Sequence, residues 1–529
     1  MNYCYGTNPL LKMDYPDPDV IFVNDTFYMI STTMHYMPGA EILRSYDLNN
    51  WEHATYVYDK LDSTGAQKLL GEEHIYGKGM WAASLRYHDG MFYVIFVCND
   101  THKTYLYRSN SIEGEWHKST IEGFYHDCSL LFDEGKAYLV HGNTDIYLTE
   151  LSSDLSVPME GGIDRCILKD TGNNRLGYEG SHIYKINGKY YLFLIHSKRD
   201  RWRRVEACFT ADSLLGEFSG GDVFDDDLGF RNSGIAQGGI VEGPENVWHA
   251  ILFQDRGAVG RIPVLVPLKW TEGILSFGIN GKAPAELKTI DPKPGYMYNP
   301  LTGSDDFRYD PIHMYTQNRR EYGCFGFKSF WQFNHEPDLD LIACDDKRGI
   351  LWIKTDKTVG NIFHAKNILT QKMTFPSCAA EVTIDGSILK DGDFAGLAAF
   401  QGDYALVGIK RENNKLYAVM SSYTNPSEDV WELGREPGKT EERIAISDDR
   451  LRVRIDTDFS GDNEDSDVAV CGVYINGEYQ KIGTEHKLRF RLDHFTGCRF
   501  GLFVMSEMTF GGRGGFSDFV YLIPNTPQP

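Results

Sequence analysis

Positive charge is scarce in this sequence of 529 residues, in which 53 Lys and Arg face 75 Asp and Glu. The formal net charge of −22 would repel a phosphate backbone, and no basic patch interleaved with aromatic residues compensates for it. A nucleic-acid partner is therefore not expected. A neutral partner such as a sugar is compatible with this charge.

Closely spaced cysteines are also lacking. The ten cysteines lie far apart and form no Cys-x-x-Cys pair, so zinc or iron–sulfur binding has no support. The first ten residues, MNYCYGTNPL, lack the basic region and the apolar core of a signal peptide. An apolar run of about eighteen residues, which a membrane span requires, does not occur. These features predict a reducing, cytoplasmic setting without membrane association.

Helical periodicity is equally sparse, because no long run places apolar residues at i, i+3, i+4 and i+7. Aromatic residues make up 13% of the chain, with 31 Tyr and 30 Phe, and this composition favours strands. The 53 glycines cluster in turn-like dipeptides. The sequence therefore predicts an all-β protein, and its length is compatible with two large domains.

A repeat organises the first 270 residues. Five times, Asn, Asp or Gly turn chemistry precedes an aromatic, β-rich run, as a tight hairpin requires. The five instances are VNDTFYMIST, HDGMFYVIFV, DEGKAYLVHG, INGKYYLFLI and GPENVWHAILF. Their aromatic anchors are Tyr28, Tyr93, Tyr138, Tyr191 and Trp248. Five repeats with a period of roughly 45 to 65 residues predict a five-bladed β-propeller, in which radial repetition protects the edges of the sheets.

The strand before each hairpin carries a second regularity. Eleven or twelve residues before the anchors lie Asp17, Trp81, Asp127, Glu179 and Gln237. Because the first strand of each blade lines the axis of a propeller, we expect these five side chains to converge. Taken singly, Asp127 and Glu179 are compatible with ordinary capping or surface carboxylates. Three carboxylates at corresponding positions of different blades favour a functional site.

Two chemistries compete for three convergent carboxylates. A hard cation usually takes about six to eight oxygen ligands, often from one compact loop, and no Asp-x-Asp-x-Asp-Gly loop occurs. Glycoside hydrolysis needs one protonated carboxylic acid and one ionised carboxylate. A third carboxylate would raise the pKa of the acid by repulsion. The set therefore favours a glycosidase, with Trp81 available to stack on a sugar; Asp14 and Asp19 are interpreted as solvated turn residues.

The segments that carry these residues resemble glycoside hydrolase family 43. The resemblance rests on NPLLKMDYPDPDVIF, GKGMWAASLRY, YHDCSLLFDEGKAYLV, YEGSHIYK, AQGGIVE and FQDRGAVGRIPVLVPLKW. It implies a five-bladed propeller enzyme that cleaves β-xylosides or α-L-arabinofuranosides with inversion. It further implies that Asp17 is the general base, that Glu179 is the general acid, and that Asp127 raises the pKa of the acid and orients it.

The resemblance implies further site residues. Arg261 matches an arginine that binds sugar hydroxyls, although a salt-bridged arginine on a strand surface is an equal alternative. Trp81 is interpreted as a sugar-stacking platform rather than as a core residue. His35, just after the first hairpin strand, is placed at the rim of the pocket, although a lone histidine more often has a structural role. Phe510 in the loop MTFGGRGG is expected to close the pocket.

Gln237 stands where several family members have a histidine on the propeller axis beside a calcium ion. A glutamine carbonyl ligates a hard cation only weakly. We therefore expect no metal ligands and no required cofactor, and leave the axis open to water or to a loosely held calcium ion.

The repeat stops after LVPLKW, and we divide the chain into a propeller at 1–300, a linker at 301–321 and a β-sandwich at 322–529. Short strands with turns such as NGEYQK and DGDFAG predict the sandwich. The segments FWQFNHEPD and GGFSDFVYL resemble the C-terminal, concanavalin A-like domain of the family's β-xylosidases. A carbohydrate-binding module is the alternative to a domain that shapes one end of the pocket, and the resemblance favours the second.

These features predict an inverting exo-glycosidase that removes xylose from the non-reducing ends of short β-1,4-xylo-oligosaccharides. An α-L-arabinofuranosidase, or a bifunctional enzyme, acting on arabinoxylan or arabinan fragments is the alternative within the class. A propeller that binds sugar without cleaving it is the alternative from another class. The expected partner is a small oligosaccharide, and assembly into a homo-oligomer is left open.

Overall fold

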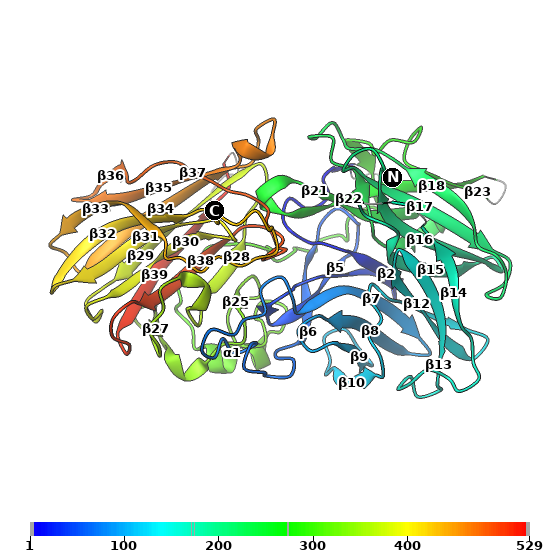
Figure 1. The fold of residues 1–529 in the computed structure, drawn as a ribbon, viewed down its shortest axis with the longest axis horizontal. Coiled ribbons are helices and arrows are strands. Elements are labelled where there is room, and N and C mark those ends of the chain that lie inside the picture. The colour runs from blue at the N-terminus through cyan, green and yellow to red at the C-terminus, as the bar shows by residue number, and fades with distance from the viewer. Residues whose placement is uncertain (1–4, 171, 174, 272–273, 525–529) are drawn as a thin grey trace.

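The strands of the computed structural model form two bodies that lie side by side (Figure 1). The structure describes residues 5–170, 172–173, 175–271 and 274–524. The first body, blue to green in Figure 1, is a five-bladed β-propeller, and the second, yellow to red, is a β-sandwich. Both confirm the predicted all-β fold class.

Five antiparallel sheets form the blades. Blade 1 contains β2 (Asp19–Val23), β3 (Thr26–Ser31), β5 (Gly39–Ser45) and β6 (Glu52–Tyr58). Blade 2 contains β7 (Met80–His88), β8 (Met91–Cys98), β9 (Lys103–Ser109) and β10 (His117–Ile121). Blade 3 contains β11 (Ser129–Asp133), β12 (Lys136–Asn143), β13 (Asp145–Leu151) and β14 (Asp164–Lys169). Blade 4 contains β15 (Glu179–Ile186), β16 (Lys189–Ser197), β17 (Arg204–Ala211) and β18 (Ser219–Phe224). Blade 5 contains β19 (Ile235–Ala236), β20 (Ile240–Glu242), β21 (Trp248–Asp255), β22 (Arg261–Thr271) and β23 (Ile274–Phe277).

The hairpin predicted in each blade is present and has a local cause. In blades 1 to 4 the turn has two residues, and both have positive φ, as the mirror-image turns that match strand twist require. The pairs are Asn24–Asp25, Asp89–Gly90, Glu134–Gly135 and Asn187–Gly188. In blade 5 the loop comprises residues 243–247. Because Asn, Asp and Gly tolerate this conformation best, the turn residues alone place four of the five hairpins.

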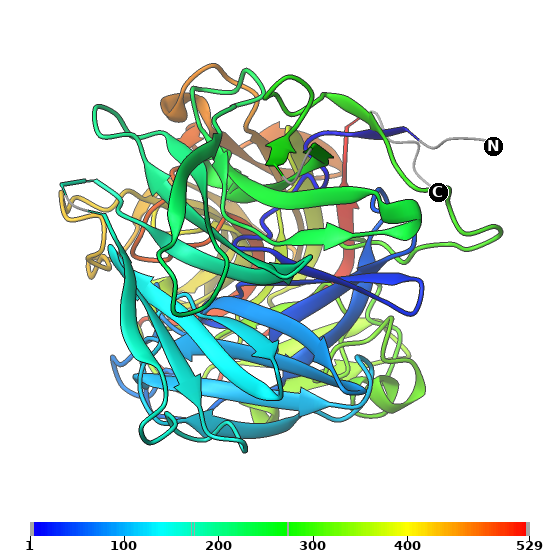
Figure 2. The ribbon, with the colours of Figure 1, turned by 90° about the vertical axis from the view of Figure 1, so that its right-hand side faces the viewer.

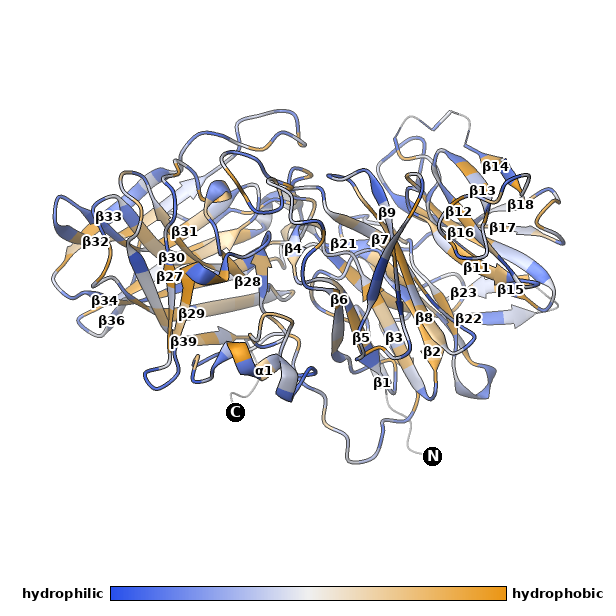
Figure 3. Cartoon of the chain, turned by 90° about the horizontal axis from the view of Figure 1, so that it is seen from below, coloured by the Kyte–Doolittle hydropathy of each residue, from blue (hydrophilic) through white to orange (hydrophobic). Residues whose placement is uncertain are grey.

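Apolar side chains fill the five spaces between neighbouring blades, and each space has its own cluster of buried residues. Hydrophobic residues accordingly lie along the strands, whereas the loops are mostly hydrophilic (Figure 3). A short sheet of β1 (Tyr5–Thr7) and β24 (Glu286–Lys288) joins the two ends of the propeller segment. Asn8 reinforces this closure, because its Nδ2 donates to the carbonyl oxygens of Leu265 and Pro284 at 2.8 and 2.9 Å.

The sandwich contains two eight-stranded sheets around one large core. The first sheet runs in the order β33 (Lys439–Ile446), β32 (Lys415–Tyr423), β31 (Tyr404–Glu412), β30 (Asp393–Phe400), β38 (Arg499–Ser506), β28 (Leu369–Lys372), β25 (Gln332–Asn334) and β4 (Tyr36–Met37). The second runs in the order β26 (Ile342–Asp345), β27 (Ile350–Lys354), β39 (Arg513–Leu522), β29 (Ser377–Asp385), β34 (Arg450–Asp458), β35 (Val468–Ile475) and β36 (Glu478–Lys481), and β37 (His486–Lys487) also pairs with β35.

One strand of the propeller segment belongs to the sandwich. β4 lies within the connection between β3 and β5 of blade 1, yet it pairs with β25, with Met37 opposite Phe333 and Tyr36 opposite Asn334. The domain boundary at residues 300 to 322 therefore does not separate two independent sheets. Figure 2 views the propeller from the side away from the sandwich, whose yellow-to-red strands lie behind it.

Little helix is present in the described part of the chain. The predicted linker contains α1 (Pro311–Gln317), which begins after Asp310, whose side chain accepts a hydrogen bond from the backbone N–H of Ile312. Single turns of 3₁₀-helix are η1 (Pro244–Asn246), η2 (Gly257–Val259), η3 (Leu339–Leu341), η4 (Ile362–His364) and η5 (Glu464–Ser466). Among the residues described, no helix combines the length and the apolar character needed to cross a membrane.

Candidate active site

A residue in the left-handed region opens the first strand of every blade. The five residues are Asp17, Ala82, Asp127, Gly180 and Gln237, with φ of 51°, 27°, 46°, 64° and 56°. Each lies eleven residues before the aromatic anchor of its blade. Non-glycine residues rarely adopt this conformation, so its recurrence in four of them marks a strained position at the same place in each blade.

Trp81 and Glu179 lie one residue before this position. The pairing of β7 with β8 shifts register between Trp81 and Ser84, and that of β15 with β16 shifts between Glu179 and His182. An extra residue in one strand re-aims the adjoining side chains. The shift therefore accounts for the twelve-residue spacing in blades 2 and 4.

Asp17 is a buried carboxylate held on both oxygens. Its Oδ1 accepts a hydrogen bond from Nη1 of Arg261 at 2.9 Å, and its Oδ2 accepts one from the hydroxyl of Thr32 at 2.7 Å. The hydroxyl oxygen of Thr32 in turn accepts from the backbone N–H of Ala82 at 2.8 Å. Donors on both oxygens fix the orientation of this carboxyl group, as the position of a general base requires.

Arg261 is fully enclosed, and its charge is matched on two sides. Besides Asp17, its Nε lies 3.4 Å from Oδ1 of Asp255. Its guanidinium also lies over the rings of Phe253 and Phe495, 4.7 and 4.4 Å from their centroids. The arginine predicted to bind the sugar is thus placed beside the predicted base.

Asp127, Glu179 and His126 form a compact group. Nε2 of His126 lies 3.6 Å from Oδ1 of Asp127 and 3.7 Å from Oε2 of Glu179. Oδ2 of Asp127 accepts a hydrogen bond from the backbone N–H of Gly180, the residue after Glu179, at 3.0 Å. This bond couples the position of one carboxylate to the backbone that carries the other.

The electrostatics of this group favour protonation of Asp127 and His126. Burial and the neighbouring carboxylates of Glu179 and Asp17 raise the pKa of Asp127 to about 7, against the opposing charge of His126. Burial lowers the pKa of His126, but Asp127 and Glu179 outweigh it and raise that pKa to about 9. The raised pKa falls on Asp127, the residue to which the sequence interpretation gave the role of raising the pKa of the acid.

Two of the groups around the carboxylates were missed in the sequence. Asn143, at the end of β12, donates from Nδ2 to Oε2 of Glu179 at 2.5 Å. His126 directly precedes Asp127 in the segment YHDCS, so its proximity to that carboxylate could have been predicted from the sequence. The contact of Asn143 could not have been predicted in this way, because it joins residues of two different blades.

The aromatic wall of the site comes from both domains. The ring of Trp81 stacks on Phe495 of the sandwich, with centroids 5.0 Å apart and an interplanar angle of 18°. Phe495 also stacks on Trp431, at 5.5 Å. Nε1 of Trp81 is buried without a hydrogen-bond partner in the described residues. Phe495 thus occupies the place predicted for Phe510, which lies elsewhere with 59% of its surface exposed.

His35 lies in the domain interface rather than at a rim. It is completely buried, and its ring lies 4.3 Å from Tyr36, 5.2 Å from His335 and 5.8 Å from His494 between centroids. A residue enclosed in this way cannot contact substrate. The structure therefore gives His35 a packing role.

Gln237 lies beside the backbone of the predicted acid. A Cβ added to Gly180 would come within 2.6 Å of the side-chain amide carbon of Gln237. The backbone N–H of Gln237 donates to Oε2 of the buried Glu206 at 2.7 Å. Gln237 therefore packs against blade 4 where the sequence interpretation left room for an ion. The absence of a required cofactor stays a prediction.

Asp14 and Asp19 are not solvated turn residues. The carboxylate of Asp14 accepts from the backbone N–H of Arg261 at 2.7 Å and from that of Gly497 in the sandwich at 2.9 Å. The carboxylate of Asp19 accepts from Nη1 of Arg86 at 2.6 Å. Both are buried, so they tie blades and domains together and leave Asp17 as the carboxylate that faces the site.

One cluster in the described residues has the composition of a metal site. Ligand atoms of His126, Asp127 and Glu179 lie within 4.8 Å of one another. An imidazole beside two carboxylates suits a transition-metal ion better than calcium, which prefers oxygen. Glycoside hydrolysis by two carboxyl groups needs no metal, and His126 already supplies the positive charge that the carboxylates require.

A propeller that brings three carboxylates from the starts of its first strands together, beside an arginine from β22 and under an aromatic wall, defines a glycosidase of the two-carboxylate type. Sequence comparison agrees: residues 6–275 match Glycosyl hydrolases family 43, and residues 327–522 match the beta xylosidase C-terminal Concanavalin A-like domain. The chain belongs to glycosyl hydrolases family 43 and hydrolyses O-glycosyl bonds.

Relatives of this chain are named as β-xylosidases or as arabinofuranosidases. A beta-xylosidase from Formosa agariphila is 26% identical over 463 residues, which are 76% of this chain and 74% of that protein. A non-reducing end alpha-L-arabinofuranosidase from Bacteroides ovatus is 29% identical over 62% of this chain and 63% of its own.

Solved structures match over almost the whole chain. A bifunctional GH43-CE protein of Bacteroides eggerthii has a TM-score of 0.87 and 36% identity, and the match covers 98% of this chain and 64% of that one. This chain therefore spans less than two thirds of the bifunctional protein. An engineered GH43 enzyme with endo-xylanase and exo-arabinofuranosidase activity has a TM-score of 0.85 and 27% identity, with 98% and 100% covered.

Proposed function

We propose that this glycosidase is an inverting, exo-acting enzyme that releases xylose from the non-reducing ends of short β-1,4-xylo-oligosaccharides. The observation that supports this most is the division of the site into two sides. Asp17 is held by Arg261 and Thr32 without a carboxylate neighbour in hydrogen-bond contact. Glu179 lies on the other side, in the group with Asp127 and His126.

In this proposal Asp17 removes a proton from water while the water attacks the anomeric carbon. Glu179 donates a proton to the departing glycosidic oxygen, and Asn143 orients its carboxyl group. Asp127 and His126 set the proton content of the acid side. Attack and departure then occur on opposite faces of the sugar, which inverts the anomeric configuration.

The exo mode is supported by the contribution of the sandwich. Phe495 lies against both Trp81 and Arg261, so one side of the site is walled by the second domain. A wall at this place favours a chain end over the middle of a polymer. This reading also favours the pocket-shaping role of the sandwich over that of a separate carbohydrate-binding module.

An α-L-arabinofuranosidase is the second candidate, because relatives of both activities cover most of this chain. The two substrates place hydroxyl groups similarly, so the same carboxylates serve either. A cytoplasmic location, in which imported oligosaccharides rather than polymers are cleaved, belongs to this proposal.

Parallel assays with nitrophenyl β-xyloside and nitrophenyl α-L-arabinofuranoside distinguish the candidates. We expect a higher kcat/KM on the xyloside, and a higher value on the arabinofuranoside would favour the second candidate. NMR of the sugar released from nitrophenyl β-xyloside, whose only other product is nitrophenol, should show α-xylose first. Initial formation of β-xylose would contradict inversion. Binding of xylobiose without cleavage of any substrate would favour the non-catalytic alternative.

A further inference from the structure

A groove of about 460 Å³ lies between the propeller and the sandwich. Trp202 and Arg204 of blade 4 and Asp255 of blade 5 line it on the propeller side. Arg489, Phe490 and Leu492, in the segment that leads to Phe495, line it on the sandwich side. Its volume falls in the range of about 300–1,000 Å³ that is typical of ligand sites.

The groove adjoins the active site through shared side chains. Asp255 lines it and also pairs with Arg261, which holds the base Asp17. On the sandwich side, the ring of Phe490 lies 6.2 Å from that of Phe495 between centroids, and Phe495 forms the aromatic wall. Asp255 and Phe490 thus line the groove and contact residues of the active site.

The groove is lined in part by the blade that carries the general acid. Glu179 begins β15, and the loop 198–203 that carries Trp202 joins β16 to β17 of the same blade. The acid protonates the departing oxygen, so the leaving group lies next to it. A groove formed partly by this blade is suited to the sugar units attached to that oxygen.

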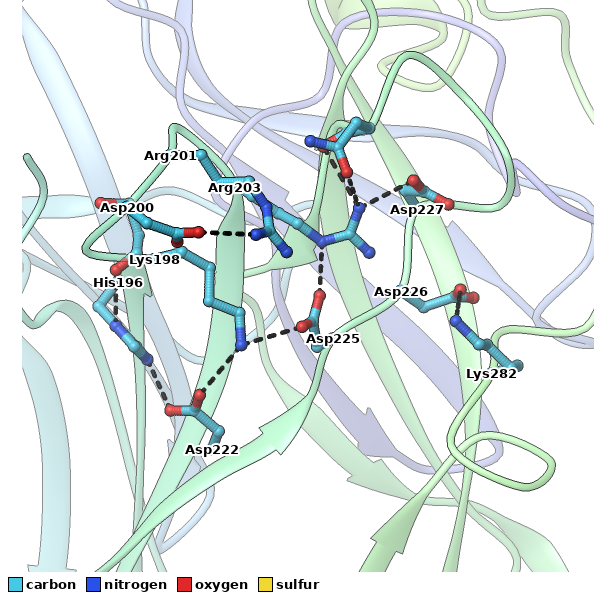
Figure 4. Close-up of polar contacts among 12 residues, drawn as sticks. His196, Lys198, Asp200, Arg201, Arg203, Asp222, Asp225, Asp226, Asp227 and Lys282 are labelled. Atoms are coloured by element: carbon cyan, nitrogen blue, oxygen red, sulfur yellow. Dashed lines mark hydrogen bonds and ion pairs between the residues drawn. The ribbon is translucent and has the colours of Figure 1, made fainter.

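Trp202 is an exposed ring on a firmly held loop. Its side chain is 53% exposed, which is unusual for tryptophan in the absence of a ligand. Ion pairs of its neighbours fix the loop: Arg203 pairs with Asp225 at 2.6 Å and Asp227 at 2.8 Å, and Lys198 with Asp225 at 2.9 Å (Figure 4).

The next residue, Arg204, completes this support. It pairs with Asp255 at 2.6 Å, and its guanidinium lies 5.5 Å from the centroid of the Trp202 ring. A ring held in this manner loses little conformational entropy when a ligand stacks on it.

The chemistry of the groove suits a neutral pyranose chain. Trp202 offers an apolar face of the size of a sugar ring, and Arg204, Asp255 and Arg489 offer hydrogen-bonding groups beside it. Acidic and basic groups are interspersed, so no single sign of charge dominates. This mixture of an aromatic platform and convergent polar groups is the usual composition of a small-molecule site.

We propose that this groove binds the xylopyranose units on the leaving-group side of the scissile bond, with Trp202 as the stacking platform. The inference rests on the proposed function and makes it more specific: the enzyme prefers oligosaccharides of three or more units over aryl glycosides and disaccharides.

The test compares Trp202→Ala with wild type on nitrophenyl β-xyloside, xylobiose and xylotetraose. We expect kcat/KM on xylotetraose to fall about tenfold, the worth of one ring-stacking contact, and that on the aryl glycoside to stay within twofold. Trp202→Phe should restore most of the loss. Phe510→Ala removes an equally exposed aromatic ring away from the groove and should change none of the three values.

Two results would contradict the proposed binding of xylose units in the groove. They are an equal loss of kcat/KM on all three substrates and an unchanged kcat/KM on xylotetraose. If wild type prefers the arabinofuranoside, the same comparison is made with arabinosylated xylotetraose. If wild type cleaves neither aryl glycoside, the proposed function fails. Calorimetry of xylotetraose binding to wild type and to Trp202→Ala then tests binding in the groove separately. Equal affinities of the two proteins for xylotetraose would contradict binding in the groove.

Discussion

Three charged groups, Asp127, Glu179 and His126, lie on the side of the site that carries the proposed acid. His126 stands within 3.7 Å of both carboxylates. Burial and repulsion by the neighbouring carboxylates raise the pKa of Asp127. The base Asp17 is kept apart from these groups by its own partner, Arg261.

Replacing Glu179 by Gln removes the proposed proton donor and keeps the shape and the contact with Asn143. We expect kcat on xylobiose to fall by about 10²–10⁴, the usual worth of general acid catalysis. A dinitrophenyl xyloside, whose leaving group needs no proton, should lose far less. Steady-state kinetics on both substrates provide the measurement, and equal losses would remove Glu179 from the role of acid.

The pH dependence follows from Asp127. Its pKa is raised from 3.8 to about 7, so the folded protein binds this proton more tightly than the unfolded chain. The stability that the proton provides is complete below about pH 4 and is lost as the pH rises through about 7. Activity that depends on protonated Asp127 should fall as the pH rises through about 7.

Asp127→Asn tests this dependence, because the amide oxygen still accepts from Gly180 but does not titrate. We expect the fall of kcat/KM near pH 7 to shift, and the free energy of unfolding between pH 5 and pH 8 to become flatter than in wild type. Urea unfolding and pH–rate profiles measure the two effects. Wild-type profiles retained by the variant would contradict the assignment.

At the scale of the element, the start of each first strand is the feature that builds the site. The left-handed residue recurs in all five blades, and it turns the chain so that side chains at or just before it face the axis. In blade 4 this residue is Gly180, whose Cα leaves room for the side chain of Gln237. The site thus depends on a backbone conformation as much as on side chains.

Gly180→Ala should therefore damage both fold and activity. The positive φ of 64° and the contact with Gln237 together should cost about 1–3 kcal/mol of unfolding free energy and displace Glu179. Gly188→Ala is the matched control, because Gly188 has a φ of 80° but open space around it. Thermal unfolding and kcat should separate the two variants; a control that loses as much activity would attribute the effect to strain alone.

The sequence predicted those parts of the fold and site that arise from local chemistry. The hairpins follow from Asn, Asp and Gly at their turns, and their repetition placed Asp17, Asp127 and Glu179 on one axis. Phe495 could not be found in this way, because it reaches the site from the other domain through contacts 414 residues away in sequence from Trp81. His35 was misplaced for the same reason, since its burial depends on His335.

At the scale of the whole molecule, a group of buried histidines joins the two domains. Burial, followed by the proximity of other histidines, places the pKa of His35 and that of His335 well below the ordinary value. Both are neutral in the folded protein and protonate more readily in the unfolded chain. Their contribution to stability is present above about pH 6.5 and is lost as the pH falls below it.

His35→Phe removes one of these groups and keeps a ring of similar size. We expect the variant to retain wild-type kcat/KM and to lose less unfolding free energy than wild type between pH 7.5 and pH 5. His117→Phe, at an exposed position, should keep the wild-type pH dependence. Urea unfolding at the two pH values is the measurement, and a large loss of kcat/KM would instead return His35 to the active site.

The pairing of β4 with β25 has a consequence for the exchange of parts between enzymes. Residues 36–37 form the edge strand of a sheet whose other strands all follow residue 331. A crossover between two parent sequences near residue 320 would therefore combine this edge strand from one parent with the rest of the sheet from the other. Recombination between relatives should succeed only when this small strand and its acceptor come from the same parent. The propeller and the sandwich should therefore be exchanged together, although each has a hydrophobic core of its own.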